Sequence, residues 1–250
     1  HIDEHLERMM NSCKSFRIDS GYSKEQLKQA CIDLVSAIGK PGYIRPQIQF
    51  GLSKLSLGAT SVVDTTIVYW PMKKYREVAE LKVVTSEIER ISPKSGGIEA
   101  KVIGFYTNSH FNHEYAKEQG VDEAIMLDVE GNVAEASSSN VFYVKDGVVC
   151  TPKPGFFLKG ITRQSILEIA KYLNIPAEEK TVTVEDLRSS DEMFLTGTAA
   201  EIDPIIEYDG RALSGGDTGP ITAKLKETYS KITRGEIAEF AHWHTIVKPA

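Results

Sequence analysis

The chain has 250 residues, of which 41% are hydrophobic, so it can bury a sizeable core as one large domain or two smaller ones. Its formal net charge is −6 and its Lys and Arg residues are dispersed, which argues against a surface that binds nucleic acid. No apolar run or signal peptide indicates a membrane protein, and three cysteines without a pairing or metal-ligand pattern favour a reducing, cytoplasmic location.

The first 70 residues alternate between helical and strand patterns. Apolar periodicity and β-branched content predict two helices and then two strands, over residues 2–16, 23–39, 43–51 and 60–70. Ser23 is a candidate N-cap and Gly39 a candidate stop signal. A Pro and Lys cluster after Trp70 interrupts the pattern. We therefore predict a small α+β domain over residues 1–70 and a linker over residues 71–80.

Residues 81–250 are predicted to form a larger domain of strands packed with helices. Strands are expected over residues 81–88, 123–128, 140–144, 148–151, 192–197 and 202–210. Helices are expected over residues 108–120, with Asn108 or Ser109 near the cap, over residues 161–174, and from Pro220 onward.

Two helix or turn starts in this domain could bind an anion. "LKGITR" from Leu158 opens a helix, where unpaired backbone N–H groups and the helix dipole attract negative charge. "TGTAAEI" from Thr196 follows a strand and could supply further N–H donors, although a plain turn is the commoner meaning of such a stretch. No G-x-G-x-x-G, P-loop or G-x-S-x-G sequence occurs, and His110 and His113 do not form H-E-x-x-H, so we expect no metal site.

Four motifs in order resemble one known family. "KVIGFY" from Lys101, "LDVEGNVAEASSSNVF" from Leu127, "LKGITR" and "TGTAAEI" are similar to the motif series of pyridoxal-phosphate enzymes of fold type IV, the class IV aminotransferases. With "YIRP" from Tyr43, the chain resembles the branched-chain amino acid aminotransferases most closely. The resemblance implies a two-domain α+β fold, a homodimer or a higher homo-oligomer, and a place in branched-chain amino acid biosynthesis. It also implies that a segment preceding His1 is missing here.

The resemblance assigns roles to individual residues. Lys101 matches the lysine that forms a Schiff base with the cofactor pyridoxal 5'-phosphate and then moves the Cα proton. Tyr106 matches the tyrosine that contacts the phenolic oxygen of the cofactor, and Glu135 the carboxylate that keeps its pyridine nitrogen protonated. Leu158 matches the residue that packs on the ring. The remaining cofactor-binding matches concern the phosphate and are Arg8, Ile161, Thr162 and Thr198.

The expected substrates are small amino acids and 2-oxo acids. Thr198 and Ala199 match the turn that binds the α-carboxylate, and Tyr43 and Arg45 match residues that reach the distal carboxylate of glutamate. Alternatively, Arg45 has a structural role and only pairs with a neighbouring carboxylate. The implied reaction is transamination of Leu, Ile and Val with 2-oxoglutarate by ping-pong kinetics. Bulky Val102, Ile103 and Phe105 after the lysine depart from the small residues common in the family and leave the substrate range open.

Other activities of the same fold type stay open. These are D-amino acid transamination, (R)-selective amine transamination and elimination by aminodeoxychorismate lyase, and a non-catalytic ligand-binding homologue is a further alternative. The Arg-x-His pair of D-amino acid transaminases is absent from "GLSKLSLGATS" at residues 51–61, which disfavours that branch. Arg163 belongs to the third motif but receives no role toward the cofactor.

Overall fold

The computed structural model describes residues 1–52, 62–71, 76 and 78–248. The chain divides into two compact units, the first made of His1–Tyr75 with Phe240–Ala250 and the second of Arg76–Glu239. The last residues of the chain, which the sequence places in the large domain, therefore belong to the first unit. Residues 72–75 and 77 of the expected linker lie outside the described residues. No described helix is long and apolar enough to cross a membrane.

The described residues of the first unit form two α-helices and a two-stranded antiparallel sheet, besides a short 3₁₀ turn near the end of the chain. Its elements are α1 (Ile2–Ser15), α2 (Lys24–Ile38), β1 (Tyr43–Phe50) and β2 (Val63–Trp70). Ser23 and Gln26 form a reciprocal capping box at the start of α2, and Gly39 ends the helix with a left-handed φ of 59°. Both helix signals in the sequence were therefore correct. Ion pairs Lys24–Glu7 and Lys28–Asp3 link α2 to α1, the helix that carries Arg8.

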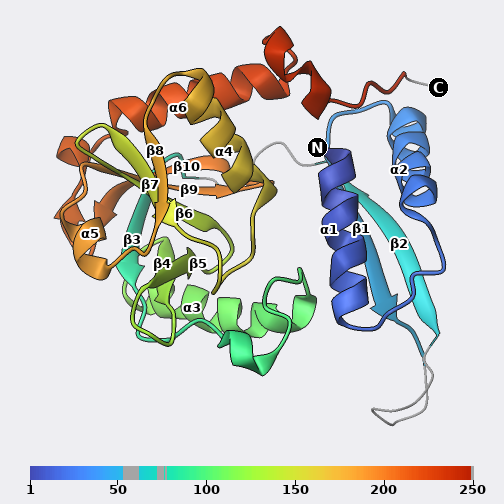
Figure 1. The fold of residues 1–250 in the computed structure, drawn as a ribbon, viewed down its shortest axis with the longest axis horizontal. Helices are drawn as coiled ribbons and strands as arrows, with labels where there is room; N and C mark the ends of the chain where they lie inside the picture. The colour runs from blue at the N-terminus through green and yellow to red at the C-terminus, as the bar shows by residue number, and fades with distance from the viewer. Residues whose placement is uncertain (53–61, 72–75, 77, 249–250) are drawn as a thin grey trace. The chain divides into compact units, whose positions relative to one another are not determined.

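The second unit is built on a nine-stranded mixed sheet. Its strands are β3 (Leu81–Thr85), β4 (Glu123–Leu127), β5 (Val133–Ala136), β6 (Asn140–Lys145), β7 (Val148–Pro152), β8 (Ala177–Lys180), β9 (Glu192–Gly197), β10 (Glu201–Tyr208) and β11 (Arg211–Ala212). Their order is β5-β4-β3-β10-β9-β6-β7-β8, and β11 pairs with β10 (Figure 1). The pairs β3–β4, β3–β10 and β7–β8 are parallel.

Four α-helices and several short 3₁₀ turns accompany this sheet. The helices are α3 (Tyr106–Glu118), α4 (Ile161–Tyr172), α5 (Val184–Arg188) and α6 (Pro220–Thr233). The 3₁₀ turns of this unit are η1 (Pro93–Ser95), η2 (Ile103–Phe105) and η3 (Ser214–Gly216). A further turn, η4 (Ala238–Trp243), belongs mostly to the first unit. The expected cap at Asn108 or Ser109 is wrong: α3 continues directly from η2, and the Asn108 amide instead donates to the Glu89 carbonyl at 2.9 Å. Strands β5 and β8 were not predicted as separate elements.

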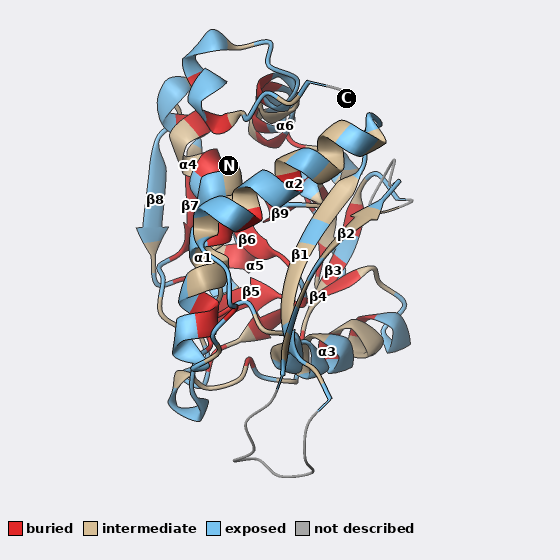
Figure 2. Cartoon of the chain, turned by 90° about the vertical axis from the view of Figure 1, so that its right-hand side faces the viewer, coloured by how far each residue is buried: buried red, intermediate tan, exposed pale blue. Residues whose placement is uncertain are grey.

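Both faces of the central strands are buried, as the red strands in Figure 2 show. Val141 and Tyr143 of β6 belong to one apolar cluster together with Met193 and Leu195 of β9. Because successive side chains of a strand point to opposite faces, Phe142 lies on the other face, where its ring stacks on Phe194 with centroids 5.0 Å apart. The sheet is thus a rigid support with apolar packing on either side.

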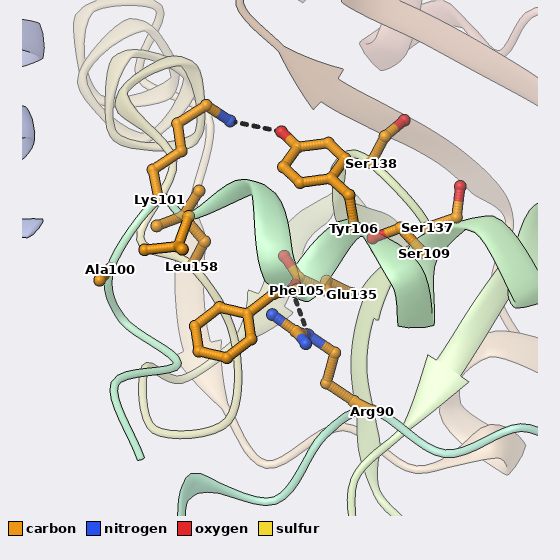
Figure 3. Close-up of a pocket in the computed structure, with 11 residues that line it drawn as sticks. Arg90, Ala100, Lys101, Phe105, Tyr106, Ser109, Glu135, Ser137, Ser138 and Leu158 are labelled. Carbon is orange, nitrogen blue, oxygen red and sulfur yellow. Dashed lines mark hydrogen bonds and ion pairs between the residues drawn. The ribbon is translucent and has the colours of Figure 1, made fainter. Parts of the chain in front are cut away.

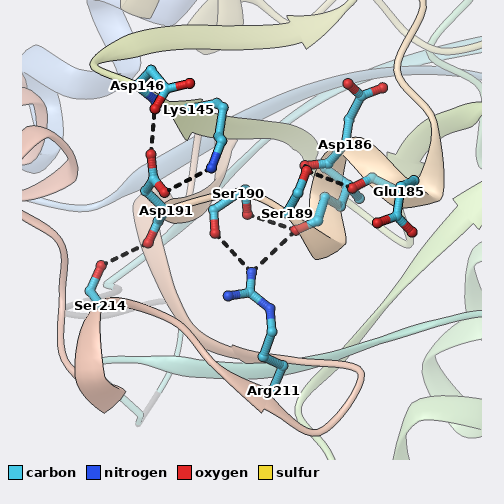
Figure 4. Close-up of polar contacts among 10 residues, drawn as sticks. Lys145, Asp146, Glu185, Asp186, Ser189, Ser190, Asp191, Arg211 and Ser214 are labelled. Atoms are coloured by element: carbon cyan, nitrogen blue, oxygen red, sulfur yellow. Dashed lines mark hydrogen bonds and ion pairs between the residues drawn. The ribbon is translucent and has the colours of Figure 1, made fainter.

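Polar contacts surround the turn between β6 and β7 at one edge of the strands (Figure 4). The Asp191 carboxylate accepts hydrogen bonds from the Asp146 backbone N–H in the β6–β7 turn and from Lys145, the last residue of β6. Arg211 donates to the Ser190 carbonyl at 2.8 Å, which connects β11 to the loop between α5 and β9. These contacts hold the β6–β7 hairpin and β9 in register, and the first residues of β6 belong to the site described next.

Candidate active site

One pocket of the second unit collects several residues that the sequence singled out. Figure 3 shows Lys101, Tyr106, Glu135 and Leu158 around it. The other residues that line the pocket are Arg90, Ala100, Val102, Phe105, Ser109, Ser137 and Ser138. The lining therefore joins segments that are far apart in the sequence and combines an amine, a phenol, a carboxyl group and small hydroxyl side chains.

Lys101 and Tyr106 contact each other across the mouth of the pocket. The amine Nζ of Lys101 lies 2.9 Å from the Tyr106 hydroxyl and 5.5 Å from the centre of its ring. The short 3₁₀ turn η2 reverses the chain between them, so that two side chains five positions apart meet. Tyr106 is the first residue of α3, and its backbone is fixed by that helix. Both side chains are exposed and so accessible to a ligand.

Glu135 lies at the floor of the pocket, near the end of strand β5. It is 8% exposed, and its carboxylate accepts a hydrogen bond of 2.7 Å from Nε of Arg90 and a longer one of 3.4 Å from the Asn140 amide. Burial raises the pKa of the Glu135 carboxyl, while the adjacent Arg90 cation and the hydrogen bonds oppose this rise. Arg90 thus favours the ionised form of Glu135 and lessens the rise in pKa that burial causes.

Arg90 and Asn140 are site residues that the sequence reasoning missed. Asn140 could have been predicted, because it stands five residues after Glu135 in the second motif. Arg90 follows β3 in a loop without any motif, and only the fold places it beside Glu135. Among the described residues, its Nη1 atom is buried without a hydrogen-bond partner, and Arg90 lines the pocket. The site therefore retains a donor that a bound molecule or water could satisfy.

The start of α4 adjoins the pocket through Leu158. Gly160 caps the helix without a side-chain hydrogen bond, which leaves the N–H groups of Ile161 and Thr162 without a capping partner from the cap residue. A Cβ atom on Gly160 would lie only 2.0 Å from the Asn140 amide oxygen, so glycine is required for this close approach. The predicted helix start thus exists, and its N-terminal end lies beside a pocket residue.

The predicted turn at Thr198 and Ala199 also lies next to the pocket. Residues Thr198–Ala200 form the tight connection between β9 and β10. A Cβ on the preceding Gly197 would lie 3.4 Å from the Ser139 hydroxyl and 3.9 Å from the carbonyl oxygen of Ser138, a residue that lines the pocket. This turn and the start of α4 are therefore both neighbours of the pocket wall.

The remaining predicted residues divide between the two units. Arg8 lies in α1, and Tyr43 and Arg45 lie in β1, all within the first unit. Of the bulky residues after the lysine, Val102 and Phe105 line the pocket. Ile103 does not, and it is 61% exposed. Residues 53–61, where the Arg-x-His pair was sought, lie outside the described residues. No cluster of metal-ligating side chains occurs in the part of the chain that the structure describes.

Comparison with known proteins defines the family. The model of the family described as amino-transferase class IV matches residues 1–208. This chain belongs to the class IV amino-transferases. The family and the enzyme class that the sequence predicted are thereby confirmed.

Relatives of this class IV amino-transferase include enzymes with known structures. The branched-chain-amino-acid aminotransferase of Pseudomonas aeruginosa is 36% identical over 253 residues, 99% of this chain and 82% of the relative. A branched-chain aminotransferase from Thermoproteus uzoniensis, crystallised with norvaline, aligns with a TM-score of 0.91 and 39% identity over 98% of this chain and 82% of that one. These similarities confirm the predicted mixed α+β fold of type IV.

A third relative of this class IV amino-transferase carries a cofactor adduct. The T.th. branched-chain amino acid aminotransferase, complexed with N-(5'-phosphopyridoxyl)-L-glutamate, aligns with a TM-score of 0.90 and 34% identity over 99% of this chain and 83% of that one. The pyridoxal-type group in that crystal structure agrees with the cofactor expected from the sequence.

Proposed function

We propose that this class IV amino-transferase uses pyridoxal 5'-phosphate to transfer the amino group of L-leucine, L-isoleucine or L-valine to 2-oxoglutarate. The observation that carries the proposal is the presence of Lys101, Tyr106 and Glu135 in one pocket. The names of the three relatives support the substrate class. The finer parts, namely the amino acceptor, the ping-pong order and the role of Lys101, are inferred from the sequence resemblance, and the chemistry of these side chains is consistent with them.

The residues of the pocket fit pyridoxal phosphate. A primary amine can hold its aldehyde, a phenol can bond its phenolic oxygen, and a carboxylate can hold its protonated pyridine nitrogen. Lys101, Tyr106 and Glu135 supply these groups, and Leu158 supplies an apolar surface for the ring. Bound there, the cofactor withdraws electrons from the substrate carbon that carries the amino group, which makes the hydrogen on that carbon acidic.

Each side chain has a distinct task in this scheme. Lys101 would hold the cofactor aldehyde, and its amine, when free, would accept the proton of the substrate Cα and donate it again. The Tyr106 hydroxyl, 2.9 Å from the amine, orients Lys101. Arg90 helps keep Glu135 ionised, so that the carboxylate can hold a proton on the pyridine nitrogen. The Asn140 amide donates hydrogen bonds to the Glu135 carboxylate and to the Leu158 carbonyl oxygen, and so fixes the spacing between these two pocket residues.

The phosphate group is assigned to the helix start beside the pocket. The N–H groups of Ile161 and Thr162 and the Thr198 hydroxyl are donors on the second unit, and Arg8 of the first unit would add a bidentate cation. No side chain caps α4 at Gly160, so its first turn is open to an anionic ligand.

The substrate is assigned to the space next to Lys101. The backbone N–H groups of Thr198 and Ala199 would bind the α-carboxylate, while Val102 and Phe105 offer apolar surface for an aliphatic side chain. Tyr43 and Arg45 are proposed to receive the distal carboxylate of glutamate. The glutamate adduct of the T.th. relative supports glutamate and 2-oxoglutarate as the second substrate pair.

Assembly and location stay predictions. A homodimer is expected, and light scattering would give a molar mass above the 27.7 kDa of a single chain. The cysteines Cys13, Cys31 and Cys150 are free and buried, which suits the cytoplasm, and cell fractionation would test this location.

The proposed function is tested first by trapping the cofactor. The purified protein is loaded with pyridoxal phosphate, reduced with borohydride, digested and mapped by mass spectrometry. We expect the cofactor mass on the peptide that contains Lys101, and none there in Lys101→Ala. Lys117→Ala is the matched control, because Lys117 is an exposed lysine at the far end of α3 and pairs with Glu114. Attachment at another lysine in the unmodified protein would contradict the assignment of Lys101.

Substrate choice is tested by the half-reaction. Loaded protein is mixed with L-leucine or D-alanine without any oxo acid, and the released 2-oxo acid is measured. L-Leucine is expected to release one equivalent per site and then stop, with further release only after 2-oxoglutarate is added, as ping-pong order requires. Release with D-alanine alone would move the assignment to a D-selective transaminase. Pyruvate from aminodeoxychorismate would move it to a lyase.

A further inference from the structure

Arg163 occupies a position that helix stability does not explain. It is the third residue of α4, where the positive end of the helix dipole disfavours a cation. It is also 3% exposed, although burial of a charged side chain has a substantial desolvation cost. A cation in such a place needs compensating contacts, and these contacts show what the side chain does.

The guanidinium group connects α4 to the sheet and to the segment before the helix. Its Nη2 donates to the Pro152 carbonyl oxygen at 2.8 Å and to the Glu179 carboxylate. Pro152 ends β7, and Glu179 lies in the neighbouring strand β8. The guanidinium carbon also lies 5.5 Å from the centre of the buried Phe157 ring, within the range of a cation–π contact. Arg163 thus fixes residues 157–163 against two strands.

The same segment is held from its other side by Asn140. The Asn140 amide donates to the Leu158 carbonyl at 3.0 Å, and Gly160 approaches it too closely to carry a side chain. Between these two contacts lie Leu158, which lines the pocket, and the first residues of α4. Two side chains, one at the pocket and one behind the segment, therefore set where the helix start lies.

We propose that Arg163 is a positioning residue for the phosphate group of the cofactor. Because Arg163 contacts Phe157 and the end of β7, it sets the position of the segment between them and the helix. Leu158 is thereby placed to contact the cofactor ring, and the N–H groups of Ile161 and Thr162 are placed to bind the phosphate. Arg163 itself does not touch the ligand. This inference rests on the proposed function, because it requires pyridoxal phosphate in the pocket.

The test compares two ligands that differ only in the phosphate. Affinities of the apoprotein for pyridoxal phosphate and for pyridoxal are measured by fluorescence titration in the wild type and in Arg163→Met. We expect Arg163→Met to weaken pyridoxal phosphate binding about tenfold and pyridoxal binding about twofold or less, since misplaced donors act on the phosphate. Arg234→Met is the matched control, because Arg234 is an exposed arginine beyond the end of α6, and it should leave both affinities unchanged.

A general loss of stability would give a different pattern. Equal weakening of both ligands, or no weakening of either, would overturn the proposal. If Arg163→Met does not fold, Glu179→Gln provides the same comparison, since Glu179 is partly exposed and its loss leaves the contact with Pro152. That variant should show a smaller loss that is still selective for the phosphate. A wild-type protein that binds no pyridoxal phosphate would instead refute the proposed function, on which the inference depends.

Discussion

Glu135 is a buried carboxyl group on which burial and an adjacent cation act in opposite directions. Desolvation raises its pKa, and Arg90, at 2.7 Å, counteracts that effect. The pairing is useful only while the carboxylate is charged, because a neutral carboxyl group could not hold a protonated pyridine nitrogen. Arg90 is therefore expected to influence catalysis through the charge of Glu135.

Replacement of Arg90 should move the pH dependence of the reaction. In Arg90→Met the pKa of Glu135 rises further, so the carboxylate takes up a proton at higher pH. The acid limb of the rate profile should shift upward by about one pH unit or more, with a smaller change at alkaline pH. Rates across the pH range check this, with the exposed Arg188→Met as control. A uniform loss of rate at every pH would argue against the effect on Glu135.

At the scale of elements, helix α6 depends on a side chain from another element. Gly219 caps it without a side chain, and Glu192 of β9 accepts the N–H groups of Ile221 and Thr222 at 3.0 and 2.7 Å. A Cβ on Gly219 would lie 2.1 Å from the Glu192 carboxyl carbon. The buried carboxylate thus joins the helix to the centre of the sheet and interacts favourably with its positive end.

Loss of this cap should destabilise the protein. Glu192→Ala leaves the buried N–H of Thr222 and the partly buried N–H of Ile221 without an acceptor and should lower the free energy of unfolding by about 2–3 kcal/mol. Glu227→Ala, on the exposed face of the same helix, removes only an i,i+4 pair with Lys231 and should cost much less. Denaturant unfolding of both variants checks this. Equal costs would mean that Glu192 does not stabilise α6.

The sequence could predict features that depend on local signals, but not those that depend on contacts between distant residues. Ser23, Gly39 and Pro220 mark helix ends through local backbone chemistry, and the structure has helix boundaries there. The cap of α6 was beyond prediction, because Glu192 is 29 residues from Ile221 and meets it only through the sheet. Strand β8 was missed because its residues Ala177–Lys180 are mostly charged and lie at the sheet edge.

The residues of the candidate site also divide into those that sequence motifs indicate and those that only the fold brings together. Lys101, Tyr106, Glu135 and Leu158 were named from motif order, and the structure places all four at one pocket. Arg90 has no motif and could not be found without the fold. Arg163 was found as a motif residue, but its contacts with Pro152 and Phe157 require the coordinates.

The stability of the whole molecule should depend on buried tyrosines at high pH. Burial raises the pKa of Tyr208 and of Tyr143 to about 12. Because an unfolded tyrosine titrates near pH ~10, this contribution to stability is complete below that pH and is lost as the pH rises toward 12. The native state should therefore weaken markedly in that window.

Tyr208→Phe tests this dependence. The variant loses the hydrogen bond between the Tyr208 and Thr85 hydroxyls and should be less stable by about 1 kcal/mol near pH ~7. Near pH ~11 the difference from the wild type should shrink by about 1 kcal/mol, since phenylalanine does not ionise. Urea unfolding at both pH values measures this, and the exposed Tyr22→Phe serves as control. A difference that is independent of pH would show that Tyr208 ionises normally.

The position of β10 in the sheet has a consequence for biosynthesis. This strand pairs with β3 on one side and with β9 on the other, although it follows all the other strands except β11 in the chain (Figure 1). A ribosome releases residues in order, so β3–β5 and β6–β9 emerge before the strand that joins them by backbone hydrogen bonds. Lys101 and Glu135 leave the ribosome early, yet the Thr198 turn and β10 come late. A nascent chain therefore completes its sheet, and the pocket supported by it, only after β10 has left the ribosome.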